Sequence, residues 1–135
     1  MNSATVHIGR ALRRPPRGEE LAAEHRSALS VVFFAGPVRM GALAAAEGVG
    51  APAMTRTIAI LERAGLVRRQ VDPADERAVL IHATPAGARM VRQGRDERVR
   101  RIAAALRRMP AASRVRLAAA AADLELLVGE LERSR

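Results

Sequence analysis

Arginine is the residue type in this sequence with the clearest chemical capability. The chain of 135 residues carries 23 basic residues against 14 acidic ones, and because every basic residue is Arg, the formal net charge of +9 is carried by guanidinium groups. A guanidinium stays protonated and donates paired hydrogen bonds to phosphate oxygens and to the edge of guanine. A compact domain with this charge attracts polyanions, so nucleic acid is the first partner to consider.

Other kinds of chemistry are poorly represented. The absence of Cys excludes thiolate zinc sites, catalytic thiols and thiol-based redox sensing. His7, His25 and His82 are too scattered for a metal cage, and no nucleophile–base pair or phosphate-binding loop is visible. We therefore expect no enzyme activity, no metal and no cofactor. With two Phe, no Tyr and no Trp, stacking on single-stranded bases is disfavoured, and duplex DNA remains as the polyanion.

Membrane association is not expected either. No apolar run approaches the ~20 residues of a membrane-spanning helix, and no apolar stretch follows the Arg-rich start as in a signal peptide. The hydrophobic fraction of 49% is enough for the core of one domain. We expect a soluble cytoplasmic protein.

The N-terminal half has helical periodicity interrupted by glycine and proline. Pro15 and Pro16 end an arm or short helix, Gly36-Pro37 ends the next pattern, and Gly48 to Gly50 form a turn. In the third helix the inward stripe consists of Met54, Ile58 and Leu61. The pattern predicts an arm or short helix over 1–18 and helices over 19–35, 40–47 and 51–64.

The period changes after Gly65. Residues 66–71 and 78–84 have the composition of two short strands, and the turn formers between them predict a β-hairpin with a charged tip. Thr84 as N-cap and Pro85 at the first helical position then begin a long helix, and for this helix start at 84–87 a purely structural role is expected. This helix extends to about 108, and a last helix covers about 112–132. His82, between apolar strand residues, is expected to be structural.

This order of elements predicts a mainly α fold with a small β-hairpin wing, namely a winged helix-turn-helix core flanked by dimerisation helices. The expected divisions are an N-terminal arm and first helices over 1–35, a DNA-binding core over 36–87, and long C-terminal helices over 88–135. The flanking helices carry more apolar surface than the core can cover, which favours a second copy as partner. The predicted dimerisation stripe consists of Leu117, Leu124, Leu127, Val128 and Leu131.

Three motifs between residues 36 and 87 resemble the MarR family of bacterial transcriptional regulators. Residues 41–49 are similar to the helix that supports that family's recognition helix, and residues 54–69 to the recognition helix and the entry into the wing. Residues 72–78 and the Thr-Pro-Ala-Gly run at 84–87 resemble the wing and the start of the long helix. The sequence departs from the family pattern at Gly50, where Ser or Thr is common, at Ala51 to Met54, and at Glu76, where the family usually has a basic residue.

The resemblance implies a homodimeric regulator, most simply a repressor, that binds a pseudo-palindromic double-stranded DNA operator. A recognition helix presents its first turns to the major groove, so we expect Ala53, Thr55 and Arg56 to face the bases. Arg56 then contacts a guanine edge or a phosphate, and Thr55 a phosphate or a thymine methyl group. The alternative for Arg56 is a solvated residue or an ion pair with Glu62 or Asp75.

The wing supplies the second group of expected DNA contacts. By resemblance, Arg77 enters the minor groove, where negative potential concentrates. Asp75 is expected to pair with Arg77 or another Arg and to hold the tip in shape. The alternative is an exposed salt bridge that contributes about 0–1 kcal/mol and has no function. Arg39, Arg68 and Arg69 are expected to contact phosphates, which position a protein without specifying sequence.

The family often binds small aromatic effectors between its arms and its DNA-binding lobe, which makes His25 and Phe33 candidates for an effector pocket. The alternative for Phe33 is a core position. Two other functions are also compatible with the sequence: a non-specific, chromatin-like duplex binder, and a winged-helix protein–protein adaptor, against which the basic recognition face argues.

Overall fold

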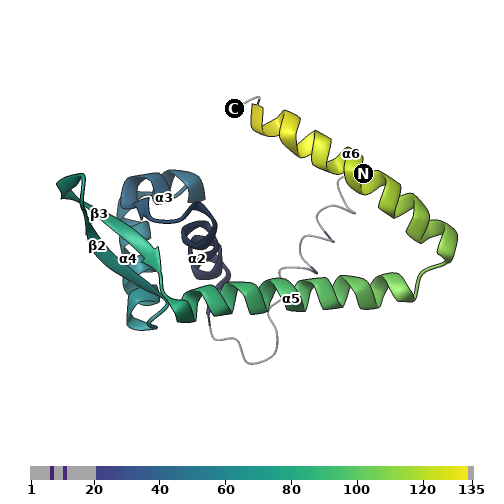
Figure 1. Cartoon of the computed structure of the whole chain (residues 1–135), viewed down its shortest axis with the longest axis horizontal. Helices are drawn as coiled ribbons and strands as arrows, with labels where there is room; N and C mark the ends of the chain where they lie inside the picture. Colours follow the sequence, from purple (N-terminus) through teal and green to yellow (C-terminus); the bar gives the residue numbers. More distant parts are fainter. Residues whose placement is uncertain (1–6, 8–10, 12–20, 134–135) are drawn as a thin grey trace. The chain divides into compact units, whose positions relative to one another are not determined.

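The computed structural model describes residues 7, 11 and 21–133 (Figure 1). The arm or short helix expected over 1–18 lies outside the described residues except for His7 and Ala11. The chain forms two compact units, residues 1–96 and 97–135. In chain order the elements are α2 (Ala23–Ala35), β1 (Val38–Arg39), α3 (Met40–Glu47), α4 (Ala51–Arg63), β2 (Val67–Asp72), β3 (Asp75–Ala83), α5 (Pro85–Arg107) and α6 (Ala111–Arg133).

Helices predominate, and the strands form one antiparallel sheet in the order β1-β3-β2. This arrangement confirms the predicted fold class, a mainly α chain with a hairpin wing. The sheet has one strand more than expected, because β1 pairs Val38 with Ile81 and Arg39 with Leu80. A strand of two residues directly after Pro37 is too short to leave a periodic signal in the sequence.

The turns fall where the sequence places glycine. Gly48 and Gly65 have φ values of 65° and 71°, in the left-handed region that favours glycine, and they follow α3 and α4 closely. α3 has the expected bounds, and α4 ends one residue earlier than expected. The hairpin is longer than predicted, since Asp72 pairs with Asp75 across a turn of two residues.

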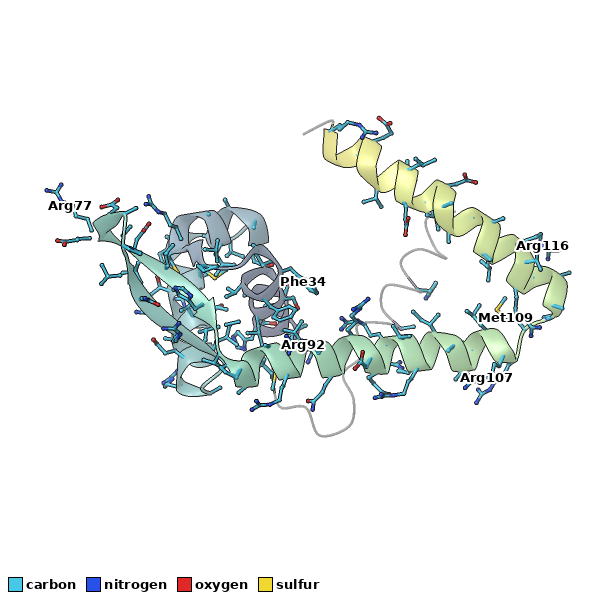
Figure 2. The ribbon with its side chains drawn as sticks, viewed as in Figure 1. Phe34, Arg77, Arg92, Arg107, Met109 and Arg116 are labelled. Carbon is cyan, nitrogen blue, oxygen red and sulfur yellow. The ribbon has the colours of Figure 1, made fainter. Side chains whose placement is uncertain are left out.

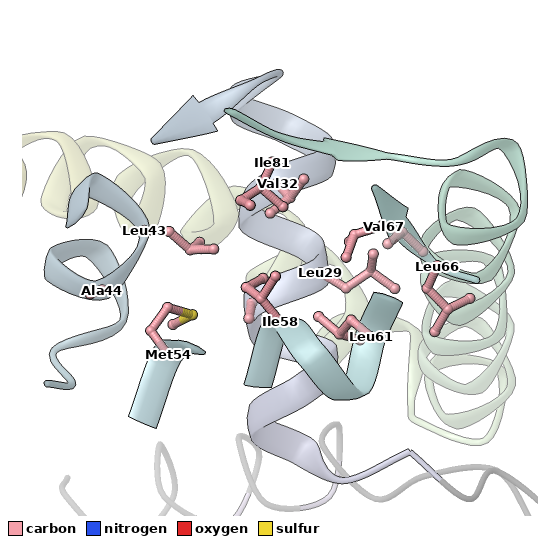
Figure 3. Packing of buried hydrophobic residues seen from close by; sticks show 12 residues of the cluster. Leu29, Val32, Leu43, Ala44, Met54, Ile58, Leu61, Leu66, Val67 and Ile81 are labelled. Atoms are coloured by element: carbon pink, nitrogen blue, oxygen red, sulfur yellow. The ribbon is translucent and has the colours of Figure 1, made fainter. Parts of the chain in front are cut away.

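The core of the first unit gathers side chains from six elements, namely α2, α3, α4, β2, β3 and α5, and from the loop between α4 and β2 (Figure 3). α2 belongs to it, because Leu29 and Val32 are 1% exposed. α5 adds Val91. The other buried apolar residues are Ala28, Leu43, Ala44, Met54, Ile58, Leu61, Leu66, Val67 and Ile81.

The start of α5 is fixed to the end of α4 by a close backbone junction. The Thr84 hydroxyl donates a hydrogen bond to the Gly65 carbonyl at 2.6 Å and accepts one from the Gly87 N–H at 3.1 Å. The Thr84 N–H donates to the Leu66 carbonyl at 3.0 Å. A Cβ atom at position 87 would lie 2.1 Å from that same Leu66 oxygen and 3.1 Å from a Leu29 methyl group. Glycine is therefore the residue that this junction admits.

The second unit contains α6, which has large apolar side chains exposed in the single chain. They include all five residues of the predicted dimerisation stripe, for example Leu124 at 60% and Leu131 at 62%. The large exposed apolar residues of α6 are Val115, Leu117, Leu124, Leu126, Leu127, Val128 and Leu131.

No helix in the described ranges is both long enough and apolar enough to span a membrane.

Replacing Gly87 by Ala should destabilise the first unit by about 1–3 kcal/mol, the usual cost of forcing an extra carbon into a packed site. Backbone rather than a flexible side chain opposes the new methyl group, so the junction must shift. Unfolding in urea measures the change. Gly41→Ala in the exposed part of α3 is the matched control, because no atom lies within 4 Å of its Cβ position. We expect that variant to be unchanged or more stable by about 0.5–1 kcal/mol. Equal stabilities of the two variants would contradict the close junction.

Candidate nucleic-acid interface

α4 has one buried side and one outward side. Its inward residues Met54, Ile58 and Leu61 are at most 2% exposed. Pro52, Arg56, Ala59 and Arg63 recur at helical spacing on the opposite side, where the proline and the two arginines are exposed and Ala59 is half-buried. The predicted orientation of this helix therefore agrees with the structure. Thr55 is exposed beside this outward row, and Ala53 is half-buried.

The N-cap position of α4 provides no side-chain hydrogen bond to the helix. Gly50 occupies the N-cap position in an extended conformation and offers no capping group, and Pro52 stands in the first turn. The carbonyl of Gly50 accepts from the N–H groups of Ala53 and Met54 at 3.0 and 3.1 Å. The Thr55 hydroxyl donates to the Ala51 carbonyl at 2.9 Å, so its proton is used inside the helix.

A buried carboxylate fixes the wing to β1. Asp72 at the end of β2 is 8% exposed, and its Oδ2 accepts hydrogen bonds from Arg39 Nη2 at 2.7 Å and Nε at 3.3 Å. Arg39 Nη2 also lies 3.7 Å from Asp75 Oδ2. Arg39, which we expected to contact phosphate, is thus occupied within the protein. A charge that is nearly buried requires such a partner, because unpaired it would lose its hydration without compensation.

The hairpin tip is shaped by two aspartates that accept backbone hydrogen bonds. Asp72 Oδ1 accepts from the Ala74 N–H at 2.9 Å, and Asp75 Oδ1 from the Arg77 N–H at 3.1 Å. Each bond spans two residues, the spacing of an Asx turn. The side chain of Arg77 is exposed and extends from the end of the wing (Figure 2).

These contacts lower the pKa of Asp72 below its usual value of 3.8. The hydrogen bond from Ala74 is the larger cause, and the hydrogen bond from Arg39 is the next. The same pairing raises the pKa of Arg39. The carboxylate of Asp72 therefore stays ionised at neutral pH and holds the wing through charge.

The arginines of β2 also have partners. Arg68 Nη1 donates to Gln70 Oε1 at 3.0 Å. Arg69 Nε lies 3.3 Å from Glu62 Oε2, which joins β2 to the last turn of α4. Glu62 therefore pairs with Arg69, and the ion pair with Arg56 that we considered does not form.

Three arginines of this surface remain available to a ligand. The guanidinium groups of Arg56, Arg63 and Arg77 form no hydrogen bond or ion pair within the described part of the chain. Arg63 was not predicted from the sequence, although its position seven residues after Arg56 places it on the same side of the helix. α4 and the wing thus expose unpaired positive charge, and the acidic residues Glu62 and Asp72 are engaged with arginines.

The two residues expected in an effector pocket are far apart along α2. Eight residues separate His25 from Phe33, which corresponds to a helical rise of about 12 Å. Phe33 is half-buried, and the guanidinium carbon of Arg92 on α5 lies 5.2 Å from the centre of its ring. Phe34 beside it is 69% exposed. In residues 7, 11 and 21–133, no three or more His, Asp or Glu side chains form a group that could hold a metal ion.

Comparison with known proteins identifies relatives along nearly the whole chain. The model of the MarR family matches residues 26–79. An uncharacterized HTH-type transcriptional regulator of Mycobacterium bovis is 33% identical over 130 residues, which cover 96% of this chain and 91% of that protein. The crystal structure of RV1404 from Mycobacterium tuberculosis is 26% identical with a TM-score of 0.80, and the match covers 94% of this chain and 86% of that one.

One of the solved structures that this chain resembles was determined with bound DNA. FabT of Streptococcus pneumoniae, determined in complex with DNA, is 18% identical with a TM-score of 0.72. The match covers 96% of this chain and 95% of that one. At this identity the likeness demonstrates the fold that the two chains share.

Asp72→Asn should lower the stability of the protein at neutral pH and have little effect in acid. A carboxylate with a lowered pKa in the folded state stabilises that state above its usual pKa, and the contribution is lost as the pH falls through the lowered value. Urea unfolding of both proteins between about pH 7 and pH 2 measures the difference.

Glu76→Gln is the matched control, since Glu76 is exposed in the same hairpin and forms no hydrogen bond or ion pair within the described residues. We expect no pH-dependent difference for that variant. A stability loss in Asp72→Asn that persists undiminished in acid would mean that charge does not hold the wing.

Proposed function

Because the chain belongs to the MarR family of transcriptional regulators, we propose that it is a homodimer that binds a specific double-stranded DNA sequence. The observation that carries this proposal is the surface formed by α4 and the wing. There, Arg56, Arg63 and Arg77 are exposed without internal partners, while the nearby acidic residues Glu62 and Asp72 are paired. The DNA complex of FabT, which has the same fold, supports the choice of partner.

In this proposal α4 enters the major groove and the wing the adjacent minor groove. Arg56 contacts a base edge, and Arg63 on the same side reaches a phosphate. Arg77, at the exposed tip, enters the minor groove. Ala53 and Thr55 border the base-reading surface, and Arg68 supplies a further phosphate contact.

Two arginines expected to contact phosphate have a different proposed task. Arg39 is a positioning residue, because its guanidinium binds Asp72 and lies near Asp75. Arg69 connects the wing to α4 through Glu62. Both hold the hairpin relative to the recognition helix, and this relative position determines whether two grooves can be contacted at once.

The proposed dimer uses α6. Exposed apolar residues that gather on one element usually mark a site of association, and α6 exposes Leu117, Leu124, Leu127, Val128 and Leu131. A twofold dimer would present two recognition helices to successive major grooves, about 34 Å apart. The preferred operator is therefore an inverted repeat.

The proposal includes neither catalysis nor a defined effector. Asp72 and Asp75 of the wing accept hydrogen bonds from the backbone, and His25 and Phe33 lie eight positions apart on α2. A regulator of this kind acts where the genome lies, so we place it in the cytoplasm. A non-specific duplex binder is the alternative, favoured by the scarcity of hydrogen-bonding side chains on the outer side of α4.

Selection from a random duplex library at about 150 mM salt distinguishes these two functions, because that ionic strength weakens binding through phosphates alone. We expect enrichment of an inverted repeat with half-sites about one helical turn apart. Tight, strongly salt-dependent binding without enrichment would favour the non-specific alternative.

Arg77→Ala should weaken operator binding roughly 5-fold to 150-fold, the range for losing a groove contact worth about 1–3 kcal/mol. The dimer and the melting temperature should not change, because the Arg77 side chain has no internal partner among the described residues. Arg95→Ala, an exposed arginine on α5, removes the same charge and is the control. If both variants lost the same amount of operator affinity, Arg77 would contribute only through its charge and not through a groove contact.

Leu124→Asp combined with Leu127→Asp should yield monomers and abolish operator binding. Two carboxylates in an apolar interface would each lose their hydration without a partner. Analytical ultracentrifugation measures the oligomeric state, and Asp123→Ala on the same helix is the control that should remain dimeric. A double variant that stays dimeric would exclude α6 as the interface.

A further inference from the structure

The base-facing part of α4 has almost no hydrogen-bonding side chains. Ala51 and Pro52 are exposed in the first turn, Ala53 is half-buried beside them, and Ala59 lies on the same side as Arg56 one turn later. Alanine and proline side chains neither donate nor accept hydrogen bonds, and proline also lacks a backbone N–H. The first turns of this helix therefore present a surface of small apolar groups.

Three residues of the first two turns, Thr55, Arg56 and Thr57, carry polar side chains, and Thr57 is half-buried. The hydroxyl proton of Thr55 is donated to the Ala51 carbonyl at 2.9 Å, so this side chain retains only the capacity to accept. Arg56 is exposed and has no partner among the described residues. Among the exposed residues of the first two turns, Arg56 is the one whose hydrogen-bond donors have no partner in the described part of the chain.

The chemistry of the major groove limits what such a surface can read. Thymine presents a methyl group there, and guanine presents two acceptors that suit a guanidinium. Adenine is read best by Asn or Gln and cytosine by a carboxylate. Residues 51–63 include neither Asn nor Gln, and their one carboxylate, Glu62, pairs with Arg69. Thymine and guanine are therefore the bases that this helix fits.

On the premise of the proposed function, we infer that each operator half-site is read through thymine methyl groups packed against Pro52 and the neighbouring alanines. Arg56 binds one guanine next to these thymines. An apolar contact requires heavy atoms within about 4–4.5 Å, and the small side chains around Gly50 let the helix approach the bases that closely. Sequence choice by this protein depends on methyl groups more than on hydrogen bonds.

Deoxyuridine in place of individual thymidines tests the inference with the wild-type protein. The replacement removes the methyl group and leaves base pairing unchanged. In the operator selected from the library, we expect at least two thymines of each half-site to show about fourfold weaker binding when replaced, the effect of one apolar carbon withdrawn from water. Replacement of the contacted guanine by 7-deazaguanine should weaken binding as well.

The outcomes separate the inference from the proposed function. A protein that selects an inverted repeat but binds the deoxyuridine duplexes equally well has the proposed function without methyl readout, which would overturn the inference alone. A protein that selects no sequence would overturn both. Losses at particular thymines support the inference and identify the positions where α4 lies.

Two protein variants assign the contacts to residues. Pro52→Ser should reduce the effect of deoxyuridine at one thymine and preserve the effect of 7-deazaguanine. Arg56→Ala should do the reverse, so each variant controls for the folding of the other. Unchanged deoxyuridine effects in Pro52→Ser would show that the methyl groups are contacted from elsewhere and would overturn the assignment to α4.

Discussion

The direction in which α4 faces depends on three buried side chains. A helix of thirteen residues is marginal in water by itself, so its position must come from packing. Met54, Ile58 and Leu61 bury one side of it in a core that α2, α3 and the sheet share. Everything that the opposite side offers to a partner follows from this constraint, because turning the helix would place Arg56 in the core.

Some charged side chains of the first unit form ion pairs within the protein, and others are exposed without such a partner among the described residues. Asp72 binds Arg39 and Glu62 binds Arg69, so each acidic group neutralises an arginine that holds two elements together. Arg56, Arg63 and Arg77 are left outside these pairs. The arginines that give the chain its net charge of +9 therefore have different roles. Arg39 and Arg69 stabilise the wing, and Arg56, Arg63 and Arg77 face outward on α4 and at the hairpin tip.

The sequence predicted the fold well and the partners of individual arginines poorly. Gly48, Gly65 and the Thr-Pro-Ala-Gly run at 84–87 mark the ends of elements locally, so the bounds of α3, α4 and α5 were within one or two residues of those observed. The pairing of Arg39 with Asp72 joins positions 33 residues apart and depends on β1, which is too short to have a pattern. The place of α2 in the core is likewise a long-range property.

The junction at Gly87 has a consequence for how relatives of this protein can diverge. A side chain at 87 would collide with the Leu66 carbonyl, so replacement of this glycine costs stability. The outward positions of α4 are under no such restriction, since Pro52 and Arg56 contribute nothing to the core. Substitutions on that side can therefore change the target sequence of a relative, while the junction and the core keep the scaffold unchanged.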